Sequence, residues 1–440
     1  IGPALISGIA ASRFSLPPMV GYLLCGFVLN LSGMYDHDRL TMIGDLGVTL
    51  LLFTIGLKLD LRSLLRPVIW AGTTLHTTIF IAVLGALLYW MSLACIQAFS
   101  NIDIGKAMLI GFALSFSSTE FAVKTMEDKG EYQSKYGQTA IGVLIMQDIF
   151  AVLFIAASTG KLPSVWALGL LVLIPMRYVL MRLLDRAGHN GELQILYGIA
   201  LAFGAYSLFD AVDVKGDLGA LIIGAMLASH PLAGDVSKRL LGFKDLLLVG
   251  FFLSIGMSGN ITVSTMVIAL FLTVLVLFKG VVFFALFTRF KMRARTATLS
   301  SLTLTNYSEF GLIVAAIAVT NAWMTEDWMV TIALALTLTI IIAAPINMRA
   351  VHLYGRLRST VRKFETDSVL PEDELPDIGN AKIAVIGMGR LGTSVYDKLV
   401  QDYGDFLIGI DNDPDIIIEQ KTAGRNVILA DATDDEMWER

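Results

Sequence analysis

Ser118-Thr119-Glu120-Phe121 and Tyr307-Ser308-Glu309-Phe310 each place a carboxylate in the middle of a long apolar run, and this doubling decides the fold. Two further pairs follow in the same order. Gly21–Gly26 resembles Gly219–Gly224, and FTIGL at 53–57 resembles LSIGM at 253–257. The offsets are 189, 198 and 200 residues. Three matches at a nearly constant offset predict an ancestral duplication, which is typical of secondary transporters.

The composition predicts a polytopic α-helical membrane protein. Of the 440 residues, 55% are hydrophobic and 16% are charged, and the mean hydropathy of +0.70 lies far outside the soluble range. A helix needs about 20 apolar residues to cross a bilayer, and that length predicts thirteen transmembrane segments. Their spans are 1–13, 17–33, 42–58, 67–97, 105–127, 136–158, 163–185, 192–210, 215–230, 240–257, 262–288, 295–320 and 327–355. Because the first begins at Ile1 without an initiator Met, we expect the natural protein to begin earlier.

The Lys and Arg residues of alternate loops predict the orientation. One set holds Arg13, Lys58, Arg62, Arg66, Lys124, Lys129, Lys135, Arg177, Arg182, Arg186, Lys238, Arg239, Lys244, Arg289, Lys291, Arg293 and Arg295. The other holds Arg39, Lys106, Lys161 and Lys215. This bias predicts that the first set and the C-terminus are cytoplasmic. Because seven helices separate the members of each repeated pair, the repeat is predicted to be inverted.

Inverted repeats place their sites near the membrane midplane, where helices break. We expect breaks in the fifth and twelfth segments, which gather the hydroxyl and amide side chains that unwound backbone needs. These are Ser115, Ser117, Ser118 and Thr119 in one segment, and Thr303, Thr305, Asn306, Tyr307 and Ser308 in the other. The alternative is that these side chains only bond to their own helix.

Asp148 is the leading candidate for the ion-carrying residue. It lies about twelve residues, or ~18 Å, from each end of its predicted helix. An intramembrane carboxylate is a functional candidate, and burial favours its protonated form. Such a group holds either a proton or a dehydrated cation, so alternating access would exchange one for the other. The neighbouring Gln147 adds an amide oxygen without charge, and a structural ion pair at Asp148 is the alternative.

Lys279, Glu309 and Glu120 are the other intramembrane charges. Lys279 lies about nine residues, or ~14 Å, from the end of its helix, too deep to snorkel. We therefore expect it to pair with Asp148, Glu309 or Glu120 in the transport site, or in a purely structural bridge. We expect the two glutamates to line the ion path, to pair with Lys279, or to stabilise a half-helix N-terminus through its dipole.

A polar linker, predicted to span 356–380, separates residues 1–355 from a Rossmann-like unit at 381–440. In that unit a short apolar strand runs into a G-x-G-x-x-G turn and an amphipathic helix, so we expect a phosphate-binding loop. Two later strands end in acids suited to the ribose and the adenine. The nucleotide-contact candidates are Gly387, Gly389, Arg390, Leu391, Gly392, Asp411 and Asp431. NAD, NADH, AMP and ATP all remain open as ligands, as does an empty site. Since such a unit needs about six strands, we expect it to continue past Arg440.

Several classes of function are disfavoured. Cys25 and Cys95 form no disulfide framework, and the five histidines are too scattered for a zinc site. A nucleotide-gated channel is the second candidate, but no T-V-G-Y-G selectivity filter is present. A membrane oxidoreductase is the third, but no flavin, haem or paired catalytic cysteine motif accompanies the glycines. We therefore expect a transporter without a catalytic cofactor, and not an enzyme. Nothing in the sequence indicates nucleic-acid binding.

With these motifs the chain resembles monovalent cation/proton antiporter family 2, in particular Kef-type potassium/proton antiporters with a C-terminal RCK (TrkA-N) domain. The resemblance rests on Gln147-Asp148, Ser117-Ser118-Thr119, Lys279, Ser308-Glu309-Phe310 and the glycine motif with Ala430-Asp431. It implies a homodimer in the cytoplasmic membrane, in which a mobile six-helix core carries K⁺ or H⁺ at Asp148, with Na⁺ as the alternative cation.

The resemblance also implies gating by an adenine nucleotide, AMP or NAD(H), and by glutathione or a soluble regulatory subunit. The loop from His230 to Asp235 is similar to the Kef regulatory loop, so both residues are candidate contacts of the gate. One departure is Glu120, because the family usually has an apolar residue there. The exchange ratio and selectivity therefore stay open. The residues expected to bind glutathione would lie beyond Arg440.

Overall fold

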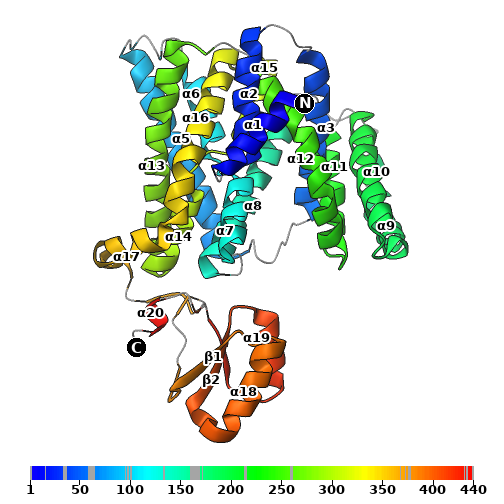
Figure 1. Ribbon diagram of the computed structural model, residues 1–440. Coiled ribbons are helices and arrows are strands. Elements are labelled where there is room, and N and C mark those ends of the chain that lie inside the picture. The colour runs from blue at the N-terminus through cyan, green and yellow to red at the C-terminus, as the bar shows by residue number, and fades with distance from the viewer. Residues whose placement is uncertain are drawn as a thin grey trace.

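The computed structural model shows a bundle of long helices joined by α17 to a small α/β domain (Figure 1). It describes residues 2–14, 16–32, 37–57, 65–94, 96, 99, 102–131, 134–158, 169–170, 172–212, 216–257, 261–366, 368–371, 373–374, 378–430, 432 and 435–438. The first half of the bundle contains α1 (Gly2–Arg13), α2 (Pro18–Ser32), α3 (His37–Leu57), α5 (Pro67–Leu93), α6 (Ile104–Ser115), α7 (Thr119–Lys129) and α8 (Lys135–Ala157). The second contains α9 (Leu173–Ala187), α10 (Gly191–Asp210), α11 (Gly216–Leu227), α12 (Ala233–Met257), α13 (Val263–Arg289), α14 (Ala294–Leu304), α15 (Glu309–Thr320) and α16 (Glu326–Met348).

The polytopic helical fold is confirmed. Among the described residues, six helices are long and apolar enough to span a membrane, and α14 with α15 forms one further span bent by 43°. Parts of α2 and α3, and all of α11, are shorter apolar helices. Two predicted bounds are wrong. The last membrane helix ends at Met348 instead of residue 355, because a separate amphipathic helix, α17 (Ala350–Val361), follows it. The tenth segment begins at Ala233 instead of residue 240.

Both predicted helix breaks are present. The fifth predicted segment divides into α6 and α7, with residues 116–118 unwound between them, and the twelfth divides into α14 and α15, with residues 305–308 unwound. Each break separates the C-terminus of one half-helix from the N-terminus of the next. The unwound residues are nearly all buried in the protein, as irregular backbone at membrane depth requires.

The repeated glycines meet across the two halves of the chain. A Cβ on Gly26 of α2 would lie 2.8 Å from the Cα of Gly256 on α12, and one on Gly56 of α3 would lie 2.9 Å from the Cα of Gly224 on α11. Gly26 corresponds to Gly224 in the repeat, and Gly56 corresponds to Gly256. The two contacts are therefore the same contact made twice with the halves exchanged, as an inverted duplication requires.

Contacts between helices divide the membrane part into two bundles. In one, called here the scaffold bundle, α1–α3 pack with α9–α12. In the other, the core bundle, α5–α8 pack with α13–α16. Figure 1 shows the two bundles side by side. Each combines helices from both repeats, and the core bundle contains both breaks.

After α17 and a short 3₁₀ turn, η3 (Arg362–Phe364), the chain enters a three-stranded parallel sheet of order β1-β2-β3. Its elements are β1 (Ile383–Ile386), α18 (Arg390–Tyr403), η4 (Gly404–Phe406), β2 (Leu407–Asp411), α19 (Pro414–Thr422), β3 (Val427–Leu429) and α20 (Asp435–Trp438). Parallel pairing joins Ile383 to Leu407 and Gly409 to Val427. This arrangement confirms the predicted Rossmann-like unit.

Candidate functional site

The two unwound segments are bonded directly to each other. The backbone N–H of Ser118 donates to Oδ1 of Asn306 at 2.7 Å, and the Ser117 hydroxyl donates to the carbonyl of Leu304 at 2.8 Å. All these groups are buried, so the bonds replace the water that the bilayer lacks. Asn306 was expected only as part of a break-forming composition. Its side chain instead holds the break of the other repeat.

Gln147 of α8 braces the first break. Its Oε1 accepts from the N–H of Ser117 at 2.9 Å, and its Nε2 donates to the carbonyl of Ser115 at 3.1 Å. The amide thus satisfies both a donor and an acceptor that unwinding leaves free. Gln147 was expected to add an uncharged oxygen beside Asp148. That oxygen bonds to the backbone of Ser117, and a contact of Gln147 with the ion stays a prediction.

Asp148 of α8 lies beside the N-terminus of the half-helix α7. The hydroxyl of Thr119, the first residue of α7, is 3.5 Å from both oxygens of the Asp148 carboxylate. Asp148 is 2% exposed, so nearly all of its surface is covered by protein. Ser118 also contributes here, since its hydroxyl accepts from the N–H of Phe121 in the first turn of α7. The positive end of α7 thus lies beside a buried carboxylate, an arrangement that favours negative charge or a cation bound to it.

The prediction that Lys279 pairs with a carboxylate is wrong, because its ammonium group contacts backbone carbonyls instead. Its Nζ donates to the carbonyls of Phe116 at 2.5 Å, Asn306 at 2.8 Å and Leu114 at 3.5 Å. The Tyr307 ring lies 5.5 Å from the same nitrogen. Among the described residues no ion pair joins Lys279 to Asp148, Glu309 or Glu120. The physical reason is that unwinding leaves the carbonyls at the C-terminal ends of α6 and α14 without partners, and the two half-helix dipoles point their negative ends at this cation.

Glu309 and Glu120 begin the two half-helices on the other side of the breaks. Glu309 is the first residue of α15, is 5% exposed and accepts a bond of 3.2 Å from the Ser308 hydroxyl. Glu120 lies in the first turn of α7 and is half-buried. The charges that act on Glu120 include those of Lys244 on α12 and of Glu309. The glutamates therefore occupy the helix-dipole positions that were one of their three expected roles.

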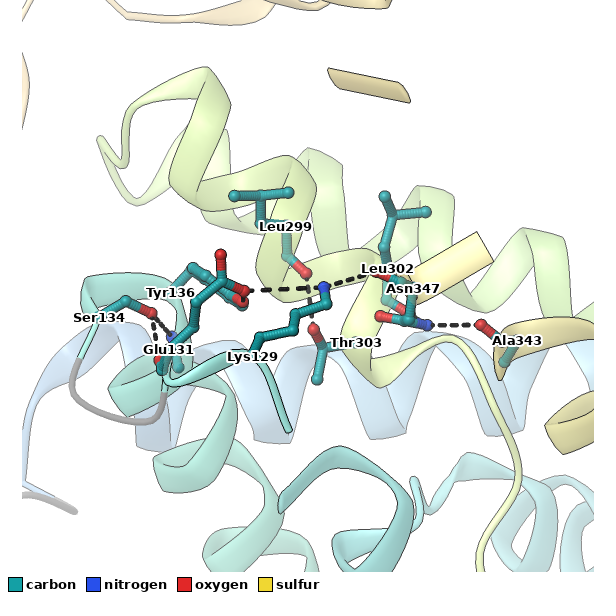
Figure 2. A network of polar contacts seen from close by, with 10 residues as sticks. Lys129, Glu131, Ser134, Tyr136, Leu299, Leu302, Thr303, Ala343 and Asn347 are labelled. Carbon is teal, nitrogen blue, oxygen red and sulfur yellow. Dashed lines mark hydrogen bonds and ion pairs between the residues drawn. The ribbon is translucent and has the colours of Figure 1, made fainter. Parts of the chain in front are cut away.

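A polar network closes the end of the core bundle next to the α16–α17 junction (Figure 2). The ammonium of Lys129, at the end of α7, donates to the carbonyl of Asn347 on α16 at 2.5 Å and lies 3.7 Å from Oε2 of Glu131. The Tyr136 hydroxyl of α8 donates to the same Glu131 oxygen. Asn347 in turn donates to the carbonyl of Leu302 on α14 at 3.2 Å. Four helices of the core bundle are thus tied together at one end.

The linker also bonds to the core bundle, which the sequence did not reveal. Oδ2 of Asp373 accepts from the N–H of Arg293 at 2.7 Å, and Oδ1 accepts from the Thr296 hydroxyl at 2.6 Å. Oε2 of Glu365 accepts from the N–H of Ala294 at 3.0 Å. Two linker carboxylates therefore cap the N-terminus of α14, the half-helix that leads into the second break. The sequence had predicted only a polar linker here.

In the α/β domain the glycine turn has the geometry of a phosphate-binding loop. Gly387 has φ of +83°, and a Cβ on Gly392 would lie 1.6 Å from the carbonyl oxygen of Gly387. Gly389 differs, because its φ is ordinary and a Cβ there would meet nothing within 4 Å. Close approach of a ligand to the backbone explains a glycine at such a position. Arg390 and the exposed Leu391 begin α18 next to this turn.

Asp411, at the end of β2, bonds to this turn. Its Oδ2 accepts from the N–H of Met388 at 2.6 Å and its Oδ1 from the N–H of Asp413 at 2.9 Å. Asp411 is therefore fixed beside the loop, and its contact with a ribose remains a proposal. Asp431 lies outside the described residues.

The predicted regulatory loop is held by its neighbours in the scaffold bundle. Nε2 of His230 lies 3.1 Å from Oδ1 of Asp185 on α9, and the N–H of Leu232 donates to Nδ1 at 3.2 Å. Asp235 lies in the first turn of α12 instead of in a loop. Contact of His230 or Asp235 with the nucleotide-binding domain stays a prediction.

Two crossed broken helices, a buried carboxylate at one half-helix and an inverted repeat define a secondary transporter of the cation/proton antiporter class. Residues 1–349 match the family described as sodium/hydrogen exchanger, transmembrane, and the chain belongs to that family. Residues 383–440 match the TrkA-N domain, which is a nucleotide-binding domain.

The relatives agree with the predicted Kef-type resemblance, which is confirmed. Glutathione-regulated potassium-efflux system proteins KefC of Salmonella schwarzengrund (strain CVM19633) and of Salmonella typhi are each 28% identical to this chain. Each match covers 98% of this chain and 71% of the relative. The solved sodium proton antiporter MjNhaP1 of Methanocaldococcus jannaschii shares the fold, with a TM-score of 0.53 at 14% identity over 80% of this chain and 96% of its own.

Replacing Lys279 by Met should destabilise the membrane part. The carbonyls of Phe116 and Asn306 would lose their buried donor, and a buried acceptor left unpaired costs about 1–3 kcal/mol. The expected result is a lower melting temperature in detergent and in lipid, measured by tryptophan fluorescence. Lys238→Met, at an exposed position of α12, is the matched control. An unchanged melting temperature for Lys279→Met would contradict the assigned contacts.

Binding of the linker to the N-terminus of α14, called docking here, should strengthen as the pH falls. Burial raises the pKa of Asp373 above its ordinary value of 3.8, although the bonds from Thr296 and Arg293 act in the opposite direction. The docked form therefore binds a proton more tightly than a released form, so this contribution is present at low pH and is lost as the pH rises through the raised pKa. The surrounding charges are those of Arg293, Lys135 and Glu365.

Hydrogen exchange at the amide of Leu370 measures this docking, since that N–H donates to the carbonyl of Lys291 at 2.8 Å. After correction for intrinsic exchange rates, protection should rise as the pH falls toward the raised pKa. Asp373→Asn should remove this dependence, whereas Glu365→Gln should keep it. Protection in the unaltered protein that does not vary with pH would contradict the prediction.

Proposed function

We propose that this protein exchanges K⁺ for H⁺ across the cytoplasmic membrane by alternating access, with Asp148 as the carrying group. The observation that carries the proposal is the Asp148 carboxylate, 2% exposed and next to the positive end of α7. A carboxylate in that setting is stabilised by taking up either a proton or a dehydrated cation. Since one group holds one of the two ligands, release of one on each side of the membrane gives exchange.

The surroundings of Asp148 suit an alkali cation. The Thr119 hydroxyl lies within reach of both carboxylate oxygens, and the break places further hydroxyls, those of Ser117 and Ser118, in the same segment. Oxygen donors of this kind replace the hydration shell of a hard cation. The Lys279 ammonium is turned away to the carbonyl ends of the breaks, so it does not neutralise the Asp148 carboxylate directly.

Potassium is proposed over sodium because the relatives that match nearly all of this chain are named potassium-efflux proteins. The sodium proton antiporter that shares the fold is only 14% identical, so its cation carries less weight. We further propose the homodimer, the cytoplasmic C-terminus and the regulation by glutathione or a soluble subunit that the Kef resemblance implies.

Gating by an adenine nucleotide, AMP or NAD(H), is proposed to act through the linker. The contacts of Asp373 and Glu365 join the linker to the N-terminus of α14, and α14 runs into the second break. Only nine residues separate Asp373 from Ile383, the first residue of β1. A displacement of the nucleotide-binding domain would therefore pull on the cap of a helix that borders the ion site.

Asp148→Asn should abolish exchange, because the amide neither binds a proton near neutral pH nor carries the charge that attracts a cation. Proteoliposomes are loaded with a pH dye, and K⁺, Na⁺ or Rb⁺ is added outside. Uptake of the cation in exchange for protons should raise the internal pH of the wild-type vesicles, most strongly with K⁺. The variant should lose the signal at least 100-fold, about 2.7 kcal/mol at 1.36 kcal/mol per tenfold change.

Asp327→Asn, which changes an exposed carboxylate at the start of α16, should exchange at the wild-type rate. Normal exchange by Asp148→Asn would refute the carrier role. A larger response to Na⁺ than to K⁺ would identify the alternative substrate. Unitary currents in a bilayer recording would favour a channel instead of a carrier.

Asp373→Asn should uncouple the nucleotide from the carrier while keeping the exchange itself. The amide has one acceptor oxygen where the carboxyl group, charged or protonated, has two, so the cap of α14 loses one bond, about 1 kcal/mol. Exchange is measured with AMP and with NADH. The difference between nucleotide-bound and nucleotide-free rates should shrink several-fold, while nucleotide affinity stays unchanged. Glu374→Gln, at the exposed next position, should keep the full effect, and an equal effect of both variants would contradict linker gating.

A further inference from the structure

Helix α5 carries three polar residues on one face inside the core bundle. Thr73, His76 and Thr77 are spaced i, i+3 and i+4, so their side chains lie next to one another. Their exposed fractions are 0%, 0% and 6%. The face packs toward α13 of the other repeat, since the His76 ring stacks on Phe283. None of these residues belongs to the two breaks or to the surroundings of Asp148 described above.

All four polar atoms of this face have no hydrogen-bond partner among the described residues: Oγ1 of Thr73, Nδ1 and Nε2 of His76, and Oγ1 of Thr77. Most buried polar atoms have a partner, and leaving one unmade costs about 1–3 kcal/mol. Other buried threonines use the ordinary helical solution. Thr273 and Thr337 donate to the carbonyl four residues earlier, at 2.7 and 2.8 Å. Thr73 and Thr77 do not, so their hydroxyls remain available to a ligand.

Aromatic rings stack on the His76 imidazole, and its two nitrogens lie at the edge of the ring. Its centroid lies 3.5 Å from that of Phe283, with 5° between the planes, and 5.8 Å from that of Phe80. Stacking fixes the ring but satisfies neither nitrogen, because their bonds lie in the plane of the ring. Phe283 is one turn after Lys279 on α13. The backbone of Lys279 lies beside the imidazole, but its contact with the ring lacks the geometry of a hydrogen bond.

The chemistry of this face selects its ligand. Two hydroxyls and a neutral imidazole both donate and accept hydrogen bonds, and a water molecule does the same. A metal cation is disfavoured by the nearby ammonium of Lys279. We propose that Thr73, His76 and Thr77 form an internal site for water in the core bundle.

Nuclear magnetic resonance of the full chain, labelled with ¹⁵N-histidine and held in lipid nanodiscs, tests the site without any transport assay. The His76 signals are those lost in His76→Gln, and the exposed His189 and His352 serve as internal references. We expect the ring N–H of His76 to exchange with water and to show a cross-peak to bound water. A His76 ring N–H that shows neither would overturn the proposal.

Thr73→Val and Thr77→Val, combined, separate a wet site from a dry one. If water binds there, removing both hydroxyls weakens its binding, and the ring N–H of His76 should exchange with water several-fold more slowly. If the face is dry, the valines remove two unsatisfied groups, which should raise the melting temperature and leave the His76 signals unchanged. That second outcome would also overturn the proposal.

Discussion

The interaction on which the membrane part depends is the one between the Lys279 ammonium and the carbonyls of two unwound segments. A bilayer supplies no water to a broken helix, so a break is stable only where protein groups replace the lost backbone bonds. One cation serves the carbonyls of Phe116 and Asn306 at once. Gln147 and the Asn306 side chain satisfy N–H groups of the first break. The crossing is therefore held together by polar contacts whose partners are mostly backbone.

The two breaks place positive and negative side chains at opposite half-helix ends. The C-terminal ends of α6 and α14 are negative and receive Lys279, whereas the N-terminal ends of α7 and α15 are positive and lie beside Asp148, Glu120 and Glu309. The repeated glutamates of the opening motif occupy equivalent places at these two positive ends. Asp148 has no counterpart in that motif, and this asymmetry distinguishes the proposed carrying group from the glutamates at the helix ends.

The sequence predicted the features whose signals are local. Serine, threonine and asparagine in apolar runs indicated both breaks, and the repeated glycine segments indicated the inverted duplication. The contacts of Gly26 with Gly256 and of Gly56 with Gly224 appeared only in the structure. The partner of Lys279 was missed because charge matching considers only side chains, whereas its partners are carbonyls that every residue carries. Asp373 was missed for a similar reason: nothing in an acidic linker reveals which helix end it caps.

Helix α14 joins these findings into one mechanical argument. Its N-terminus is capped by Asp373 and Glu365 of the linker, and the carbonyl of Leu304 at its C-terminus accepts from Ser117 of the other break. Its eleven residues span about 16 Å at 1.5 Å per residue. In the proposed gating, a shift of the linker would therefore reach the second break through a single short helix. A half-helix in place of a full one allows this, because α14 ends inside the core bundle, where the proposed ion site lies.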